Sequence, residues 1–210
     1  EEDIKKTGYV VLASELKHAK KINGHFELIL NSSDKIQCKY LINASGLHTE
    51  DVANRIEEIN LPKIKTVMYA KGHYYLYKKK NPFKHLIYPL PNSNGHGIHA
   101  GMDIENNLRF GPNAKWVDSI EYSFDENTLE EFCNSIKSYW INFDSSCLTP
   151  DYTGIRSKIV AEGEGSQDFE ILDASDHGLE NLIHLQGIDS PGLTSSLSIA
   201  AEVISKLGIH

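Results

Sequence analysis

The hydrophobic positions of this chain form short runs typical of β-strands, with a few stretches that have helical spacing. The clearest run is Leu-Ile-His-Leu at residues 182–185, which predicts a buried strand. A turn rich in Gly, Ser and Pro follows it, and Gly208 stands where a subsequent helix should end. One face of that helix is marked by apolar residues at Leu193, Leu197, Ala200, Ala201, Ile204 and Leu207.

A tight connection from a strand to a helix directs free backbone N–H groups, and the positive end of the helix dipole, at one point. That point suits a phosphate, a carboxylate or the electron-rich edge of a cofactor ring. An ordinary buried connection between a strand and a helix has the same pattern, so the pattern alone leaves both interpretations open.

In the N-terminal region, apolar and polar residues alternate in the way that is typical of half-buried strands. Residues 9–13 predict a short buried strand, and residues 26–38 predict a β-hairpin with one buried face. The second arm continues over residues 40–46 as an apolar run, which predicts a strand buried on both faces. It ends in small residues that let a bulky group approach the backbone, namely Ala44, Ser45 and Gly46. A short helix should follow, with Thr49 as its N-cap.

The pattern changes from about residue 62, where short strands are separated by turn residues. This spacing predicts an antiparallel sheet with strands in residues 62–77, 87–91, 97–103 and 108–111. A helix is expected over residues 130–140, capped by Asp125 or Thr128.

The last third opens with a strand at residues 152–158, which a hairpin loop rich in Gly joins to a second strand at residues 168–171. Doubly buried strands therefore lie near both ends of the chain, with antiparallel strands between them. We expect an α/β (α+β) fold in which residues 1–61 and 151–210 form one layer. Residues 62–150 would be an inserted domain built on an antiparallel sheet.

Composition and charge exclude several classes of function. The 210 residues carry a net charge of -8, which argues against a nucleic-acid binder because such a protein needs a basic face. The sharp basic run at residues 78–80 fits a solvated loop. No apolar run is long enough to span a bilayer. The chain starts Glu-Glu-Asp without an initiator Met, so we expect it to be part of a longer protein.

Cysteine and histidine usage gives no metal or disulfide pattern. The 3 cysteines are widely separated and fit a reducing compartment, so we expect a cytoplasmic location. His96 and His99 lie close together in the sequence, but no third ligand has matching spacing. We therefore expect no metal site.

Several motifs together resemble a known family. Residues 41–48, Leu-Ile-Asn-Ala-Ser-Gly-Leu-His, resemble the "vINAAGlha" element of the D-amino-acid-oxidase superfamily of flavoproteins. Residues 71–76 resemble the "KG-Y-Y" element of its L-2-hydroxyglutarate dehydrogenase-like branch. Further segments match that branch in the same order over essentially the whole chain, at residues 86–91, 97–99, 109–113, 152–156 and 186–197.

The resemblance implies an FAD-dependent dehydrogenase or oxidase that transfers a hydride from a small 2-hydroxy acid, such as L-2-hydroxyglutarate, to the flavin. It places Ala44, Ser45 and Gly46 beside the adenine–ribose–pyrophosphate half of FAD. It also places a turn against the pyrimidine edge of the flavin ring, formed by Gly187, Ile188, Asp189, Ser190, Pro191, Gly192, Leu193 and Thr194. The antiparallel sheet would cover the substrate.

The sequence departs from the family in one large respect. The N-terminal βαβ unit with its GxGxxG fingerprint is absent, and that unit provides most of the pyrophosphate site. We therefore expect this chain to be the C-terminal part of a family member, with the missing dinucleotide-binding segment as its partner. A non-catalytic remnant or interaction scaffold that cannot hold FAD alone is an alternative. A relative that oxidises glycerol 3-phosphate or an amino acid is another.

Four residues are candidates for the substrate site. Arg156 could bind a carboxylate through two parallel hydrogen bonds, although a structural ion pair would explain it equally well. His99 could act as a base on the substrate hydroxyl or be an ordinary histidine of the sheet. Lys71 could bind a second carboxylate, and Tyr74 could offer its hydroxyl to the substrate. For both residues the alternative is ordinary packing in the sheet or a solvated face. Strand alternation puts Lys71 and His73 on one face and Tyr74 on the other.

Overall fold

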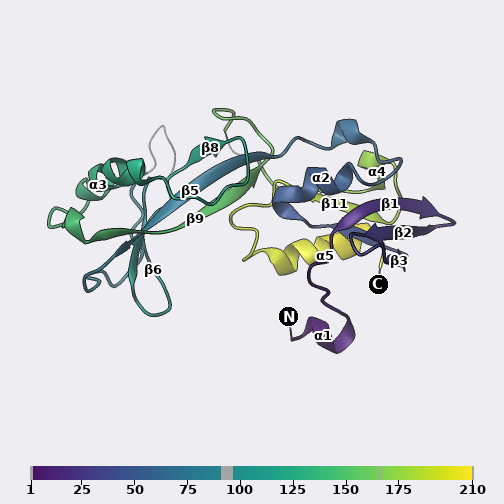
Figure 1. The fold of residues 1–210 in the computed structure, drawn as a ribbon, viewed down its shortest axis with the longest axis horizontal. Coiled ribbons are helices and arrows are strands. Elements are labelled where there is room, and N and C mark those ends of the chain that lie inside the picture. The colour runs from purple at the N-terminus through teal and green to yellow at the C-terminus, as the bar shows by residue number, and fades with distance from the viewer. Residues whose placement is uncertain (1, 91–96, 166, 210) are drawn as a thin grey trace. The chain divides into compact units, whose positions relative to one another are not determined.

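The computed structural model describes residues 2–90, 97–165 and 167–209, and its chain divides into two compact units (Figure 1). Unit 1 is Glu1–Val67 with Ser166–His210, and unit 2 is Met68–Gly165. An inserted unit was expected, but its boundaries differ from the expected residues 62–150. Residues 62–67 belong to unit 1, and residues 151–165 belong to unit 2 because a long strand carries them into its sheet.

A small sheet in unit 1 contains the buried strand predicted near the C-terminus. This strand, β11 (Leu182–Gln186), is buried at every position. It runs parallel to β4 (Leu41–Asn43) and antiparallel to β10 (Glu170–Leu172), in the order β10-β11-β4. The prediction that residues 40–46 are buried on both faces was wrong. Only three of them form a strand, and Ile42 is 43% exposed because β4 is the last strand of this sheet among the described residues.

The helix after β11 is α5 (Ser196–Lys206), and it ends at Gly208 in the left-handed conformation, as predicted. The predicted buried face was wrong. Leu193 is 91% exposed and Leu197 is 85% exposed, and of the predicted residues Leu207 packs against β11, together with Val203 and Ile199, which were not predicted. This helix carries two apolar stripes, and periodicity alone does not determine which one faces the sheet.

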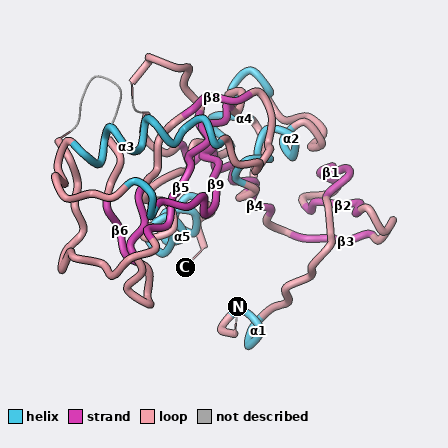
Figure 2. Tube along the Cα trace, turned by 60° about the vertical axis from the view of Figure 1, so that its left-hand side comes forward, coloured by secondary structure: helices cyan, strands magenta, loops and turns pink. Residues whose placement is uncertain are grey.

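A second sheet in unit 1 contains β1 (Leu16–Ile22), β2 (His25–Leu30) and β3 (Lys35–Cys38), joined antiparallel in that order (Figure 2). The β2–β3 hairpin confirms the prediction for residues 26–38. Residues 9–13 form no strand, and Tyr9 is 95% exposed, because nothing in the described residues pairs with this segment. The short helices of unit 1 are α1 (Ile4–Thr7), α2 (Thr49–Ala53) and α4 (Ala174–His177).

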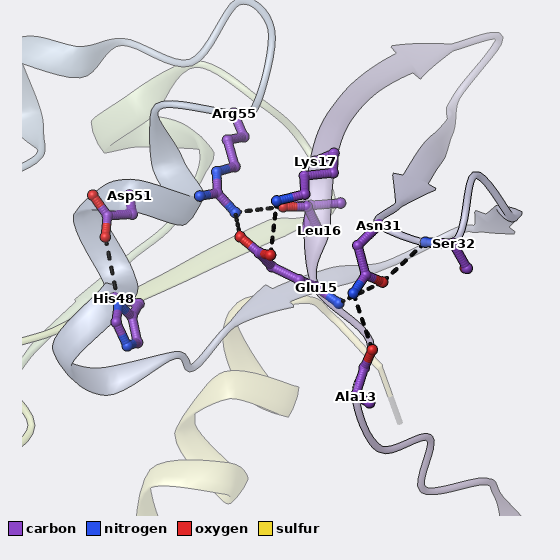
Figure 3. Close-up of polar contacts among 9 residues, drawn as sticks. All are labelled: Ala13, Glu15, Leu16, Lys17, Asn31, Ser32, His48, Asp51 and Arg55. Carbon is purple, nitrogen blue, oxygen red and sulfur yellow. Dashed lines mark hydrogen bonds and ion pairs between the residues drawn. The ribbon is translucent and has the colours of Figure 1, made fainter.

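Ion pairs hold the start of β1 against the segment after α2 (Figure 3). The Arg55 guanidinium lies 2.7 Å from a carboxylate oxygen of Glu15 and donates to the Leu16 carbonyl at 2.6 Å. Lys17 contacts the same carboxylate at 2.7 Å. The two cations hold the pKa of Glu15 below its ordinary value, chiefly through their hydrogen bonds.

Unit 2 is a five-stranded antiparallel sheet, as predicted for the middle of the chain. The strand β5 (Met68–Tyr77) pairs with β9 (Leu148–Lys158) along one edge and with β7 (Leu108–Phe110) and β8 (Lys115–Val117) along the other. β6 (Ala100–Met102) pairs with β7. Figure 1 shows β5 and β9 running side by side as the long axis of this unit.

The predicted strand at residues 87–91 is absent from the described part of unit 2. Ile87 makes an isolated bridge to Ala100, and the chain then continues without pairing through Pro89, which has no N–H to donate. Pro91 lies outside the described residues.

One face of β5 packs against α3 (Leu129–Lys137) to form the core of unit 2. The Tyr75 ring lies 4.6 Å from that of Phe132 between centroids, and Ile136 is fully buried beside them. Asp125 accepts the Asn127 N–H and so caps the short turn that leads into α3. Thr128 occupies the N-cap position of α3, but its hydroxyl donates back to the Asp125 carbonyl.

The loop that joins β9 to β10 does not form the expected hairpin. β9 belongs to the sheet of unit 2 and β10 to that of unit 1, so the two strands are not paired with each other. In the described part of the chain, no helix is long and apolar enough to cross a membrane.

A buried polar network joins β4 to β11. The Asn43 amide nitrogen donates to the Thr49 carbonyl at 2.8 Å and lies 3.0 Å from Nδ1 of His184, a side chain that is 0% exposed. The Asn43 oxygen accepts from the Ser45 hydroxyl at 2.6 Å, which fixes the amide orientation. His184 must therefore accept at Nδ1 and stay neutral. Burial, with a smaller contribution from His177, lowers the pKa of His184 to about 4.

We expect acid to destabilise unit 1 through His184. Its folded-state pKa is below the ordinary value near 6.5, so its contribution is fully present above about pH 6.5 and falls as the pH drops to about 4, by roughly 3 kcal/mol in total. His184→Asn keeps an acceptor near Nδ1 but does not titrate. Urea unfolding at about pH 7 and about pH 4.5 should show a smaller pH dependence in this variant than in the wild type. An equal pH dependence in the two proteins would contradict this assignment.

Candidate functional site

In unit 1, the parallel strands β4 and β11 end at the same edge of their sheet, because His184 lies opposite Asn43 in the ladder. Residues 44–46 leave β4 at this edge, and the turn of residues 187–195 leaves β11 there. Ligands of α/β folds bind outside the carboxyl ends of parallel strands. The structure thus brings together the two groups of predicted cofactor-binding residues.

The backbone after β4 is open to a large group. Ala44 is exposed, and Gly46 has a φ of +59° with no described atom within 4 Å of the position of a Cβ. The Asn43 side-chain oxygen accepts from both the hydroxyl and the N–H of Ser45, so Asn43 serves the local backbone and its neighbour. This edge can therefore accommodate a bulky ligand against main-chain atoms.

Thr49 does not cap α2 as expected. It is the first residue of the helix, it is fully buried, and its hydroxyl donates to the Leu185 carbonyl at 2.7 Å. The N-cap position belongs to His48, whose side chain makes no cap hydrogen bond. Thr49 therefore connects α2 to β11 directly beneath the edge where both strands end.

The turn after β11 is tight and leaves the helix start without a side-chain cap. A Cβ on Gly192 would lie 2.6 Å from the Asp189 carbonyl oxygen, so this position requires glycine. The Ser195 hydroxyl donates to the Pro191 carbonyl at 3.1 Å and makes no cap hydrogen bond to α5. The first N–H of this 11-residue helix, that of Ser196, donates to the Leu193 carbonyl at 3.3 Å, and the N-cap side chain makes no hydrogen bond to the N–H groups that follow it. These features fit the flavin edge that the resemblance implies.

In unit 2, Arg156 and Tyr74 come together on one face of the sheet. The ladder pairs Ala70 with Arg156 and Tyr74 with Tyr152, so these side chains share that face. The Arg156 guanidinium donates a hydrogen bond to the Tyr74 hydroxyl. Burial raises the pKa of Tyr74, and the nearby Arg156 acts in the opposite direction. Tyr74 is therefore a neutral phenol at physiological pH.

An aromatic stack supports this face. The Tyr74 and Tyr152 rings are stacked with centroids 4.5 Å apart. The Arg109 guanidinium lies 5.9 Å from the Tyr152 ring and is held by Asp151 at 2.6 Å and Asp103 at 2.9 Å. Sequence reasoning missed Tyr152 and Arg109. The strand alternation in Tyr-Thr-Gly-Ile-Arg could have indicated Tyr152, because it puts that residue on the face of Arg156.

His99 contacts the Tyr88 ring. The His99 and Tyr88 rings lie 4.2 Å apart between centroids. Arg156 and Tyr74, two of the four predicted substrate residues, thus meet on one face of the sheet, and His99 pairs with Tyr88. His96 lies outside the described residues.

Lys71 lies on the other face of β5, as strand alternation predicted. It is 6% exposed, and its ammonium group contacts the Ser123 hydroxyl at 3.4 Å. On the same face, Nδ1 of His73 lies 3.0 Å from the Asn113 side-chain oxygen. Burial lowers the pKa of His73. The structure therefore does not bring Lys71 together with Arg156.

Among the described residues, no group of three His, Cys, Asp or Glu side chains is arranged to hold a metal ion. The chemistry available to these residues is hydrogen bonding, ion pairing and proton transfer.

The DAO family, described as FAD dependent oxidoreductase, matches residues 3–206. This match covers almost the entire chain. The chain belongs to the family of FAD dependent oxidoreductases.

Relatives within the family differ in the substrate that their names give. The mitochondrial L-2-hydroxyglutarate dehydrogenase of Arabidopsis thaliana is 32% identical over 178 residues, which are 79% of this chain and 37% of that protein. The glycerol 3-phosphate dehydrogenase of Caloramator mitchellensis is 27% identical over 208 residues, which are 94% of this chain and 39% of that protein. This chain therefore spans about two fifths of the length of these relatives.

Solved structures confirm the α/β fold class. The dithionite-reduced L-alpha-glycerophosphate oxidase from Mycoplasma pneumoniae with FAD bound matches with a TM-score of 0.78 at 17% identity, over 94% of this chain and 50% of that chain. The glycine oxidase from Geobacillus kaustophilus matches with a TM-score of 0.71 at 13% identity, over 95% of this chain and 50% of that chain. At these identities the likeness concerns the fold alone.

We expect Thr49→Val to destabilise unit 1 by about 1–3 kcal/mol, because it leaves the buried Leu185 carbonyl without this donor at nearly constant side-chain volume. Urea unfolding measures the change in free energy. Thr66→Val is the matched control, because Thr66 is exposed and its substitution should change stability by less than about 0.5 kcal/mol. Equal effects of the two substitutions would contradict the role of Thr49.

Proposed function

We propose that this chain is part of an FAD-dependent oxidoreductase that oxidises a small 2-hydroxy acid such as L-2-hydroxyglutarate. The observation that carries the proposal is the meeting of Arg156 with Tyr74 on one face of unit 2. Family membership supports the reaction class, and the Arabidopsis relative, 32% identical, supports the substrate class.

Arg156 is proposed to bind the substrate carboxylate. Its guanidinium is permanently charged and planar, so it can donate two parallel hydrogen bonds to both carboxylate oxygens. The hydrogen bond to Tyr74 restricts its orientation, which lowers the entropy lost on binding.

Tyr74 and His99 are proposed to act at the substrate hydroxyl. Burial raises the pKa of Tyr74, so its phenol stays protonated and serves as a hydrogen-bond donor. Removal of the hydroxyl proton is therefore assigned to His99, whose ring lies 4.2 Å from that of Tyr88. Lys71 as the ligand of a second carboxylate is the less favoured part of the proposal, because it lies on the opposite face of β5.

The proposed cofactor residues are those at the edge of unit 1, from Ala44 to Gly46 and from Gly187 to Thr194. FAD, when bound, supplies the acceptor for the hydride. The open backbone at Gly46 would lie along the dinucleotide. The start of α5 would stabilise negative charge through its N–H groups and helix dipole.

The missing dinucleotide-binding segment is the proposed partner. Unit 1 leaves an apolar stripe of α5 exposed at Leu193, Leu197 and Ile204, and Ile42 is exposed on the last strand of its sheet. Apolar surface of this kind favours association with another folded segment. The segment would complete the pyrophosphate site, whether it belongs to the same polypeptide or to another.

Glycerol 3-phosphate is the second candidate substrate, because relatives from Caloramator mitchellensis and Mycoplasma genitalium carry it in their names. Arg156 would suit a phosphate as well as a carboxylate.

Substrate-dependent reduction of the flavin tests the proposed reaction. The protein that contains this chain, purified with FAD, should lose its visible flavin absorbance when L-2-hydroxyglutarate is added without oxygen. Glycerol 3-phosphate and glycine are the comparison substrates. Bleaching by one of these alone would replace the proposed substrate class. A colourless protein that takes up no added FAD would instead support a non-catalytic remnant or scaffold.

Arg156→Ala should raise the substrate concentration for half-maximal flavin reduction by roughly a hundredfold, because charge-assisted hydrogen bonds are lost. Flavin content should not change, since Arg156 is not among the proposed cofactor residues. Arg156→Lys keeps the charge but lacks the planar fork and should be intermediate. The matched control is Arg55→Ala in the segment after α2, which should leave the substrate requirement unaltered. An unchanged requirement in Arg156→Ala would remove Arg156 from the site.

A further inference from the structure

Two glycines face each other in the β5–β9 ladder. Gly72 is paired with Gly154, in the interior of both strands. Glycine in a strand is unfavourable by roughly 0.5–1 kcal/mol relative to alanine, and it often marks a place where a ligand or another backbone comes close. Each of the two positions therefore needs a physical reason.

Packing within unit 2 explains Gly72. A Cβ there would lie 2.7 Å from the Cβ of Pro112 and 3.1 Å from the carbonyl oxygen of Asn113. The segment that follows β7 thus occupies the space above Gly72, and a side chain would displace it.

Gly154 has neither a packing nor a conformational reason to be glycine. No described atom lies within 4 Å of the position of its Cβ, and its φ is outside the left-handed region. It is only partly buried. An alanine would fit here and should favour the strand.

The surroundings of Gly154 are those of the proposed substrate site. Arg156 and Tyr152 flank it on the same face of β9, and Tyr74 lies opposite Tyr152. Alternate residues of a strand are about 7 Å apart, so Gly154 leaves a floor without a side chain between the backbone positions of Arg156 and Tyr152, while the Arg156 guanidinium itself donates to the Tyr74 hydroxyl. That floor begins beside Arg156, the residue proposed to bind the substrate carboxylate.

We propose that Gly154 determines substrate size, because the carbon chain of the substrate lies across it while one carboxylate binds Arg156. This inference rests on the proposed function. It adds Gly154 as the residue that lets the carbon chain of a substrate such as L-2-hydroxyglutarate fit into the site. A side chain at position 154 fills the floor and excludes the longer 2-hydroxy acids first.

The experiment compares the wild-type chain with Gly154→Ala and Gly154→Val by calorimetric titration of glutarate and 2-oxoglutarate, together with urea unfolding of each protein. We expect affinity to fall roughly tenfold for Ala and below detection for Val. The unfolding free energy should stay equal or rise by up to about 1 kcal/mol, as expected for a non-glycine residue in a strand. Loss of binding without loss of stability separates a role in the site from a structural role.

Gly101→Ala is the matched control, because Gly101 is also in a strand of unit 2 and its Cβ would meet only the Arg109 carbonyl oxygen, at 3.9 Å. It should bind glutarate like the wild type. Unchanged binding in Gly154→Val overturns the inference, and so does a wild type that binds neither dicarboxylate. If the wild type binds both but L-2-hydroxyglutarate does not bleach the flavin, the proposed oxidation fails while the assignment of Gly154 stands.

Discussion

The register between β5 and β9 is the constraint on which the proposed substrate face depends. It sets Ala70 against Arg156, Gly72 against Gly154 and Tyr74 against Tyr152. Side chains alternate along a strand, so a slip of one residue would move the Arg156 guanidinium to the face that holds Lys71. Tyr75 and its neighbours in the core oppose such a slip, because they would have to leave the contact with α3.

Unit 1 depends on a different interaction, the parallel pairing of β4 with β11. Parallel pairing puts the carboxyl ends of both strands at one edge, which is where backbone groups of Gly46 and the 187–195 turn can serve one ligand. The network of Asn43, Thr49 and His184 holds the strands in this register. Its members are buried and connected by hydrogen bonds, so it favours one arrangement over alternatives with unpaired polar groups.

Errors in the sequence interpretation occur where a segment lacks its neighbour. Residues 9–13, the face of β4 that carries Ile42, and the outer stripe of α5 all have apolar patterns typical of buried elements, and all are exposed. A hydrophobic pattern shows that a segment can be buried but does not identify what covers it. Under the proposal that a dinucleotide-binding segment completes unit 1, these segments are the surfaces that it would cover.

The sequence by itself determined the elements with strong local signals. These were the buried strand at residues 182–186, the helix that ends at Gly208, the hairpin after residue 25, the antiparallel character of the middle of the chain and the family motifs. Only the tertiary structure decided which predicted site residues meet. Strand alternation by itself placed Lys71 and Tyr74 on opposite faces of their strand. That Tyr74 and Arg156 share one face, and that the floor at Gly154 is open, depends on contacts between residues distant in the sequence. Local preferences act over a few residues, whereas such contacts follow from how the strands pack.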